Sequence, residues 1–162
     1  MATIVVSDTG PLISLEKISN GFNLIRKLEY KILIPPKVLE EVSEGFIPKE
    51  RYVQHFAIED IVEIVKMAST PLIQHNERLH EGERQAITLA KSLDVPLLIE
   101  EKFGREVAKV IGLKFYGIAG LILKANKQKT ITLHEAKSCF YQLAEAGRIS
   151  RKLFLELENE LK

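Results

Sequence analysis

Short apolar runs alternate with amphipathic helical patterns along most of this chain, and this alternation is what most constrains its fold. The runs lie at residues 3–6, 31–34, 96–99 and 113–116, and a stretch with apolar residues at helical spacing follows each of them. The first run, Thr-Ile-Val-Val, is typical of a strand that is buried on both faces. Strands that alternate with helices form βαβ units with right-handed crossovers, so the sequence predicts a parallel sheet flanked by helices.

The helical patterns continue beyond the last apolar run. Along the whole chain, helical patterns lie at residues 12–18, 21–28, 37–43, 81–93, 104–111, 118–126, 133–146 and 150–161. We therefore expect a three-layer α/β/α fold plus C-terminal helices. It forms one domain over residues 1–162, with a core at about 2–127 and a helical extension at about 131–162. The pattern is least clear at 46–71, where 61–67 fits either a strand or the end of a helix.

Composition excludes several classes of protein. The net charge is only +1, so no global basic field announces nucleic-acid binding, although a local patch can suffice. The single cysteine, Cys139, excludes an internal disulfide and a cysteine-rich zinc site. No secretory signal pattern is visible, and no apolar run approaches the roughly 20 residues that span a bilayer. We expect a cytoplasmic protein without a membrane partner.

Asp8 stands where the first strand is predicted to end and the first helix to begin. Polar and turn-forming residues, Ser-Asp-Thr-Gly-Pro at 7–11, separate the two elements. In open α/β sheets this carboxyl edge is where ligands bind. Asp8 on its own fits a helix cap equally well. Its function therefore depends on whether other carboxylates reach the same edge.

Two glutamates on predicted helices are candidates to join Asp8. Glu41 flanks the apolar stripe of the helix at 37–43, whereas Glu40 points away from it. Glu83 falls within the apolar stripe of the helix at 81–93. A carboxylate on a buried helix face is costly unless it is paired, protonated or bound to a cation. The alternative for Glu83 is that the positive end of the helix dipole, together with solvent, accommodates it.

A fourth acidic position, Glu100 and Glu101, directly follows the run at 96–99. Such a pair can simply be the polar entry to the next helix. The coincidence of these positions at strand ends and on a buried helix face favours function, because packed carboxylates must take up protons or bind a cation. An all-oxygen site suits Mg²⁺ or Mn²⁺, and such ions typically serve phosphoryl chemistry.

No cysteine–histidine or serine–histidine pair offers an alternative nucleophile. The histidines are His55, His75, His80 and His134. Of these, His80 precedes Glu81 and is the one expected near the acidic positions, where a surface position at a helix start explains it more simply.

Together these four positions resemble the PIN-domain family of metal-dependent nucleases, in particular the small prokaryotic VapC-like toxins. The resemblance rests on VVSDTGPL at 5–12, IPPKVLEEV at 34–42, GERQAITLA at 82–90 and PLLIEE at 96–101, and it covers most of residues 2–125. The tail at 133–161 is similar to the helical extension of one PIN subfamily. By position, the resemblance assigns the catalytic acids to Asp8, Glu41, Glu83 and Glu101, with Glu100 as a further metal ligand.

The resemblance implies an endoribonuclease that hydrolyses single-stranded RNA with Mg²⁺ or Mn²⁺. It further implies a homodimer, a toxin role and inhibition by a cognate antitoxin protein. Phosphates need countercharge, so a positive rim is expected around the acids. The candidate substrate-binding residues are Thr9, Arg84, Lys102 and Arg105.

The sequence departs from the family pattern at the fourth position, where an aspartate is usual and both candidates are glutamates. The longer side chain disturbs the tight octahedral geometry that Mg²⁺ demands. A second interpretation is therefore a PIN-fold module that binds nucleic acid or protein with weak or no catalysis. The triplet Asp8-Thr9-Gly10 also matches the aspartic-protease motif by letters, but a helix follows it and no second copy exists.

Overall fold

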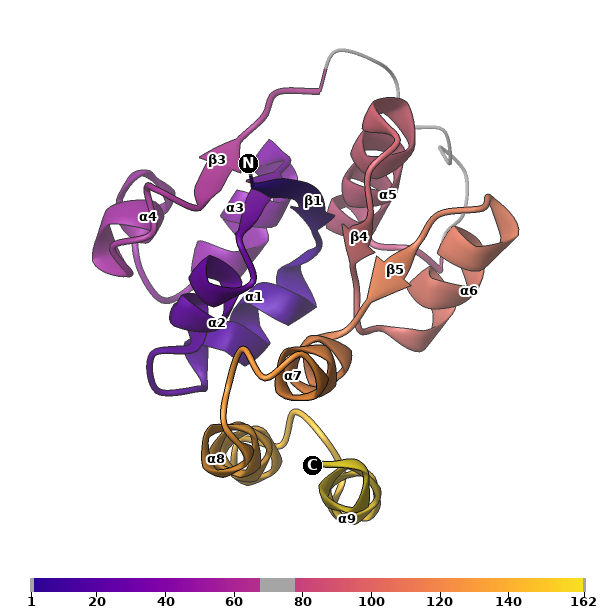
Figure 1. Ribbon diagram of the computed structural model, residues 1–162. Helices are drawn as coiled ribbons and strands as arrows, with labels where there is room; N and C mark the ends of the chain where they lie inside the picture. The colour runs from indigo at the N-terminus through magenta and orange to yellow at the C-terminus, as the bar shows by residue number, and fades with distance from the viewer. Residues whose placement is uncertain (1, 68–77, 162) are drawn as a thin grey trace.

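Strand β1 (Thr3–Ser7) lies at the centre of a five-stranded sheet in the computed structural model, which describes residues 2–67 and 78–161 (Figure 1). The strand order is β3-β2-β1-β4-β5, and each pairing in it is parallel. The other strands are β2 (Tyr30–Ile34), β3 (Val62–Ile64), β4 (Leu97–Leu98) and β5 (Phe115–Tyr116), of which β3 and β5 form the edges. Helices flank this sheet, so the predicted three-layer α/β/α architecture with a parallel sheet is confirmed.

Each helix predicted from spacing is present. The helices are α1 (Thr9–Glu16), α2 (Gly21–Lys27), α3 (Pro36–Ser43), α4 (Tyr52–His55), α5 (Glu81–Leu93), α6 (Lys102–Val110), α7 (Ile118–Lys127), α8 (Leu133–Glu145) and α9 (Arg151–Glu160). The segment whose pattern was least clear holds a 3₁₀ turn, Lys49–Arg51, then α4 and β3. The stretch 61–67 is therefore a strand at 62–64, and residues 68–71 lie outside the described residues.

Helix α1 begins three residues earlier than the sequence predicts, so Gly10 and Pro11 belong to its first turn and not to a separate loop. The first four amides of a helix have no partner within it, and a proline there removes no helical hydrogen bond. Asp8 precedes this turn in an extended conformation. The strand and the helix are therefore joined by Asp8 alone.

The register of the sheet brings the ends of its central strands together. Val6 pairs with Leu97 and Ser7 with Leu98, and the Asp8 amide donates a 3.0 Å hydrogen bond to the Leu98 carbonyl. On the other side of β1, Val6 pairs with Leu33. Asp8, the start of α3 and the residues after β4 consequently leave the sheet at one edge.

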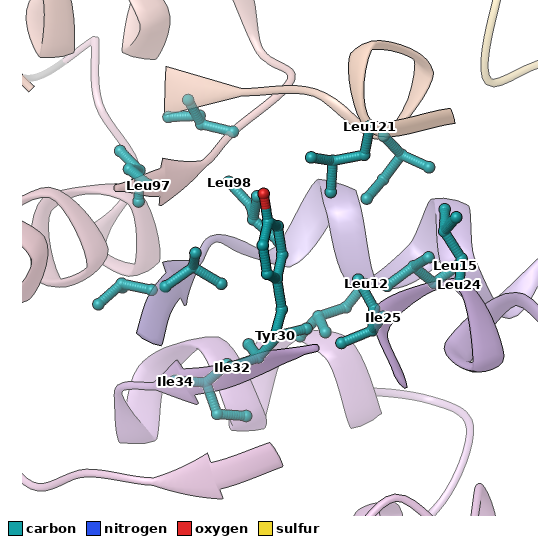
Figure 2. Close-up of a cluster of buried hydrophobic side chains, with 14 of the residues drawn as sticks. Leu12, Leu15, Leu24, Ile25, Tyr30, Ile32, Ile34, Leu97, Leu98 and Leu121 are labelled. Atoms are coloured by element: carbon teal, nitrogen blue, oxygen red, sulfur yellow. The ribbon is translucent and has the colours of Figure 1, made fainter. Parts of the chain in front are cut away.

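The core lies on both faces of this sheet. Figure 2 shows Tyr30 among side chains from the strands and from α1, α2 and α7. Ile32, Leu97 and Leu98 are fully buried. The phenol of Tyr30 accepts a 2.8 Å hydrogen bond from Lys124 Nζ, which satisfies its polar end. Among the described residues, no helix combines the length and apolar character that crossing a membrane requires.

The C-terminal helices form a hairpin against α7, at one end of the molecule (Figure 1). Helix α8 packs on α7, and α9 packs on both. Phe140 and Leu143 on α8 are buried, as is Leu157 on α9. This packing fixes the turn between α8 and α9 relative to the sheet.

Candidate active site

A cleft of about 440 Å³ opens at the carboxyl edge of the central strands. Its lining comes from the end of β1, from α3, α5 and the residues after β4, and from the α8–α9 turn. The lining residues are Asp8, Thr9, Gly10, Glu41, His80, Glu83, Glu100, Glu101, Gly147 and Arg148. All five carboxylates that the sequence analysis predicted for the site therefore line one cavity.

Asp8 is almost completely buried in this cleft, with 5% of its surface exposed. Its side chain makes no capping hydrogen bond to α1, and within the described residues Oδ1 has no partner. Burial raises the pKa of Asp8 to about 7, and the charges of Glu83, Glu41 and Glu101 add to this against a hydrogen bond from the Thr9 amide. At a buried oxygen without a donor, a cation or an added proton lowers the cost of burial.

Glu41 faces the cleft, and its neighbour Glu40 does not. Glu41 accepts hydrogen bonds from the Thr9 hydroxyl at 2.9 Å and from the Gly82 amide at 3.2 Å, whereas Glu40 is exposed and bonded to Lys37. The orientation that helical spacing indicated is therefore found. These donors hold the Glu41 carboxylate beside Thr9 at the start of α1.

Glu83 lies on the inner face of α5 with only 4% of its surface exposed. One oxygen, Oε1, accepts the His80 amide at 3.2 Å, while Oε2 has no partner within the described part of the chain. Burial, followed by the nearby charge of Glu101, raises the pKa of Glu83 against the His80 hydrogen bond. Glu83 thus resembles Asp8: each carboxylate presents a buried, unsatisfied oxygen.

Glu101 and Glu100 differ in their environments although they are adjacent. Glu101 caps α6 by accepting the Gly104 amide at 2.7 Å. Although burial works to raise it, this bond and one from the Phe103 amide lower the pKa of Glu101. Glu101 therefore remains ionised beside Glu83.

Glu100 is instead engaged by hydrogen-bond donors. Its Oε1 accepts the Ser14 hydroxyl at 2.7 Å and Arg148 Nη2 at 3.2 Å, and its Oε2 accepts the Ile118 amide at 3.3 Å. Both oxygens are thus occupied, so this placement favours Glu101 over Glu100 as a cation ligand.

Arg148 is the cleft residue that sequence reasoning missed. It lies between α8 and α9, and it donates from Nε to the Ser14 hydroxyl at 3.1 Å and from Nη2 to the Gly10 carbonyl at 3.1 Å. It also forms an ion pair with Glu100. No local pattern marked this residue, because its partners are separated from it by 48 to 138 positions along the chain.

Of the four candidate substrate-binding residues, only Thr9 lines the cleft, and the three basic ones lie elsewhere. Arg84 donates to the Leu79 carbonyl at 2.7 Å, and the Arg105 guanidinium lies 5.4 Å from the centre of the Phe115 ring. Lys102 is exposed at the start of α6. These three side chains do not line the cleft, whereas Thr9 does. Of the histidines, His80 lines it, and His75 lies outside the described residues.

The carboxylates fit a divalent cation in part. No group of three or more histidine, cysteine, aspartate or glutamate side chains in residues 2–67 and 78–161 forms a ready-made metal site. Mg²⁺, however, is commonly held by one or two carboxylates, with waters and substrate oxygens completing its octahedron. The unsatisfied oxygens of Asp8 and Glu83 match this requirement. Glu101 is the carboxylate positioned to join them.

Comparison with known proteins places this geometry in a family. A family model described as DUF3368, a PIN domain, matches residues 4–161. The chain belongs to the PIN-domain family. PIN domains are generally nucleases that use divalent metal ions.

A solved structure gives the same fold. The chain is similar to a PilT N-terminus domain protein, SSO1118, from the hyperthermophilic archaeon Sulfolobus solfataricus P2, with a TM-score of 0.59 and 18% identity over 76% of this chain and 93% of that one. At this identity the likeness concerns the fold of the PIN domain alone. No curated protein matches the chain.

Proposed function

We propose that this PIN domain is an endoribonuclease that hydrolyses single-stranded RNA with bound Mg²⁺ or Mn²⁺. The observation that carries the proposal is the pair of buried, unsatisfied oxygens of Asp8 and Glu83 in one acidic cleft. Burying a carboxylate oxygen that has no hydrogen-bond donor is costly, and a cation at this position would offset that cost. When bound, the ion activates a water for attack on a phosphodiester and stabilises the leaving oxygen.

In this proposal the cleft residues have distinct tasks. Asp8 and Glu83 hold the ion, and Glu101 completes the protein's contribution because its backbone donors keep it ionised. Glu41 is held by Thr9 and Gly82 at the side of Asp8, where it orients water. A homodimer, a toxin role and a cognate antitoxin belong to the proposal through the family resemblance only.

The test is cleavage of single-stranded RNA by the full chain with Mn²⁺ or Mg²⁺ and with a chelator. We expect metal-dependent cleavage that Asp8→Asn and Glu83→Gln each reduce at least about a hundredfold, since such an ion contributes several kcal/mol to the transition state. Glu81→Gln is the matched control, because Glu81 lies on the same helix but is exposed. Cleavage that persists in the chelator, or in both cleft variants, would contradict the proposal.

A second candidate is a PIN module that binds RNA with little catalysis. Two observations favour it: the glutamate at the fourth acidic position, and the lack of a ready-made site of three ligands in the described part of the chain. Glu101→Asp separates the two candidates. It restores the usual family residue, so a large gain in cleavage indicates that the natural chain is a weak enzyme.

A further inference from the structure

The cleft holds one feature that the acidic site does not use, the guanidinium of Arg148. We propose that Arg148, presented by the C-terminal helical hairpin, is the group that binds a phosphodiester of the substrate. This inference rests on the proposed function, in that it names the substrate contact of the same cleft.

Charge is the first reason. The described residues that line the cleft include five carboxylates, and Arg148 is the only arginine or lysine among them. A nucleic acid carries one negative charge per phosphate, and its approach to such a cavity requires a countercharge. In the proposed function, a metal ion at Asp8 and Glu83 supplies part of this positive charge. Arg148 supplies a positive charge beside Gly10 and Glu100.

Geometry is the second reason. Nε and Nη2 are fixed by Ser14, the Gly10 carbonyl and Glu100, so the plane of the guanidinium is set before any ligand arrives. Nη1 makes no hydrogen bond within the described part of the chain, and the side chain retains 28% of its exposure. An arginine held in this way offers N–H groups in a rigid fork, which suits phosphate oxygens and loses little conformational entropy on binding.

Glu100 then acts as the positioning residue for Arg148. It orients the guanidinium through Oε1, and Ser14 holds both partners. The side chains of Arg148 and Glu100 are 28% and 26% exposed, so the ion pair stays in contact with the solvent of the cleft. The C-terminal hairpin therefore supplies a working part of the cleft in addition to covering the core.

The experiment measures RNA affinity in an Asp8→Asn background, so that it does not depend on cleavage. A fluorescent single-stranded oligonucleotide is titrated at several salt concentrations with Arg148→Gln and with the control Arg151→Gln, whose arginine is exposed on α9 outside the cleft. We expect Arg148→Gln to weaken binding about tenfold, as loss of a charge-assisted hydrogen bond does. The slope of log K against log salt should become shallower by about 0.7, the value of one single-strand phosphate contact.

Arg148→Gln leaves Glu100 unpaired and can loosen the hairpin, so the double variant Arg148→Gln with Glu100→Gln removes both charges together. Circular dichroism and thermal melting verify the fold of each variant. Either variant, when folded, should show the same loss of affinity and the same change of slope. A folded double variant with the parent's affinity and slope would overturn the inference, as would equal effects of the Arg148 and Arg151 substitutions.

Failure of the proposed function has a different signature. If the natural chain cleaves nothing, yet the Asp8→Asn protein binds RNA through Arg148, the phosphate contact stands and the nuclease proposal falls. If the natural chain cleaves RNA and Arg148→Gln alters neither affinity nor salt slope, the nuclease proposal stands and Arg148 is only a structural link. Absence of both cleavage and binding rejects both.

Discussion

The backbone amide of Gly82 donates a 3.2 Å hydrogen bond to Glu41 Oε1, and this contact joins the start of α5 to the inner face of α3. The approach is so close that a β-carbon at Gly82 would overlap the Glu41 carboxylate. Glycine at this position is therefore a requirement of the cleft, although its helix would otherwise favour alanine.

This contact makes Gly82→Ala a sharp test of the Glu41 position. The added methyl group must displace Glu41 from its place beside Thr9, so we expect cleavage to fall about tenfold or more, with the overall fold retained. The control is Gly120→Ala on α7, where a β-carbon meets nothing within 4 Å. That variant should keep full activity and gain up to about 1 kcal/mol in unfolding free energy. Equal activities of the two variants would contradict the role of Glu41.

Much of this arrangement could be predicted from periodicity. Runs of β-branched residues and amphipathic stripes are local signals, and they located the parallel sheet and its helices. Helical spacing also separated Glu41 from Glu40 and placed Glu83 on the inner face of α5, where it is 4% exposed. Such patterns succeed because the side of a helix or strand that faces the core is a property of a few neighbouring residues.

Other features could not be predicted in this way. Gly10 and Pro11 carry turn signals, yet they form the first turn of α1 because a helix start tolerates both residues. The cleft position of Arg148 depends on how the hairpin packs against α7, and no local pattern encodes that packing. Whether Arg84 and Arg105 line the cleft likewise depends on how their side chains pack: Arg84 donates to the Leu79 carbonyl, and Arg105 lies over the Phe115 ring.

The raised pKa of Asp8 predicts how the stability of the metal-free protein varies with pH. The pKa of Asp8 is about 7 in the folded state against an ordinary value of 3.8, so between these values the folded state retains a proton that the unfolded state has released. Unfolding free energy must then fall as pH rises from about 4 to 7, at up to about 1.4 kcal/mol per pH unit. Glu83 acts in the same direction.

Urea unfolding in chelator at pH 5 and at about pH 7.5 measures this effect. Because the asparagine of Asp8→Asn cannot ionise, the unfolding free energy of this variant should fall much less between the two pH values. The control Glu81→Gln, at an exposed site, should show the same fall as the natural chain. A natural protein whose stability rises across this interval would show that the Asp8 carboxylate is not strained by burial.

Tyr52 forms a polar contact with Glu16 away from the cleft, and its contribution to stability can be measured. The ring is fully buried, and its hydroxyl donates a 2.7 Å hydrogen bond to Glu16 Oε2. Tyr52→Phe keeps the ring packing but leaves the Glu16 carboxylate without this donor, so we expect a loss of about 1–3 kcal/mol in unfolding free energy. Tyr141→Phe is the control, since Tyr141 is 58% exposed, and its effect should stay within about 0.5 kcal/mol. RNA cleavage per folded molecule should be unchanged in both.

Metal binding has a stability signature that is independent of turnover. An ion that binds only the folded state stabilises it by an amount that grows with its concentration relative to Kd, about 2.7 kcal/mol at one hundred times Kd. For a chain of this size that corresponds to a rise in Tm of roughly 5–10 °C. We expect Mn²⁺ to raise the Tm of the natural protein, with a shift that grows above pH 7 as Asp8 loses its proton.

The cleft variants assign that shift to particular carboxylates. Asp8→Asn and Glu83→Gln should abolish most of it, and Glu101→Gln should reduce it. Glu100→Gln should leave it nearly unchanged, because Ser14, Arg148 and the Ile118 amide already occupy the Glu100 oxygens. A Glu100→Gln protein that loses the Mn²⁺ response while Glu101→Gln keeps it would reverse the assignment, and the ion would then lie on the Arg148 side of the cleft.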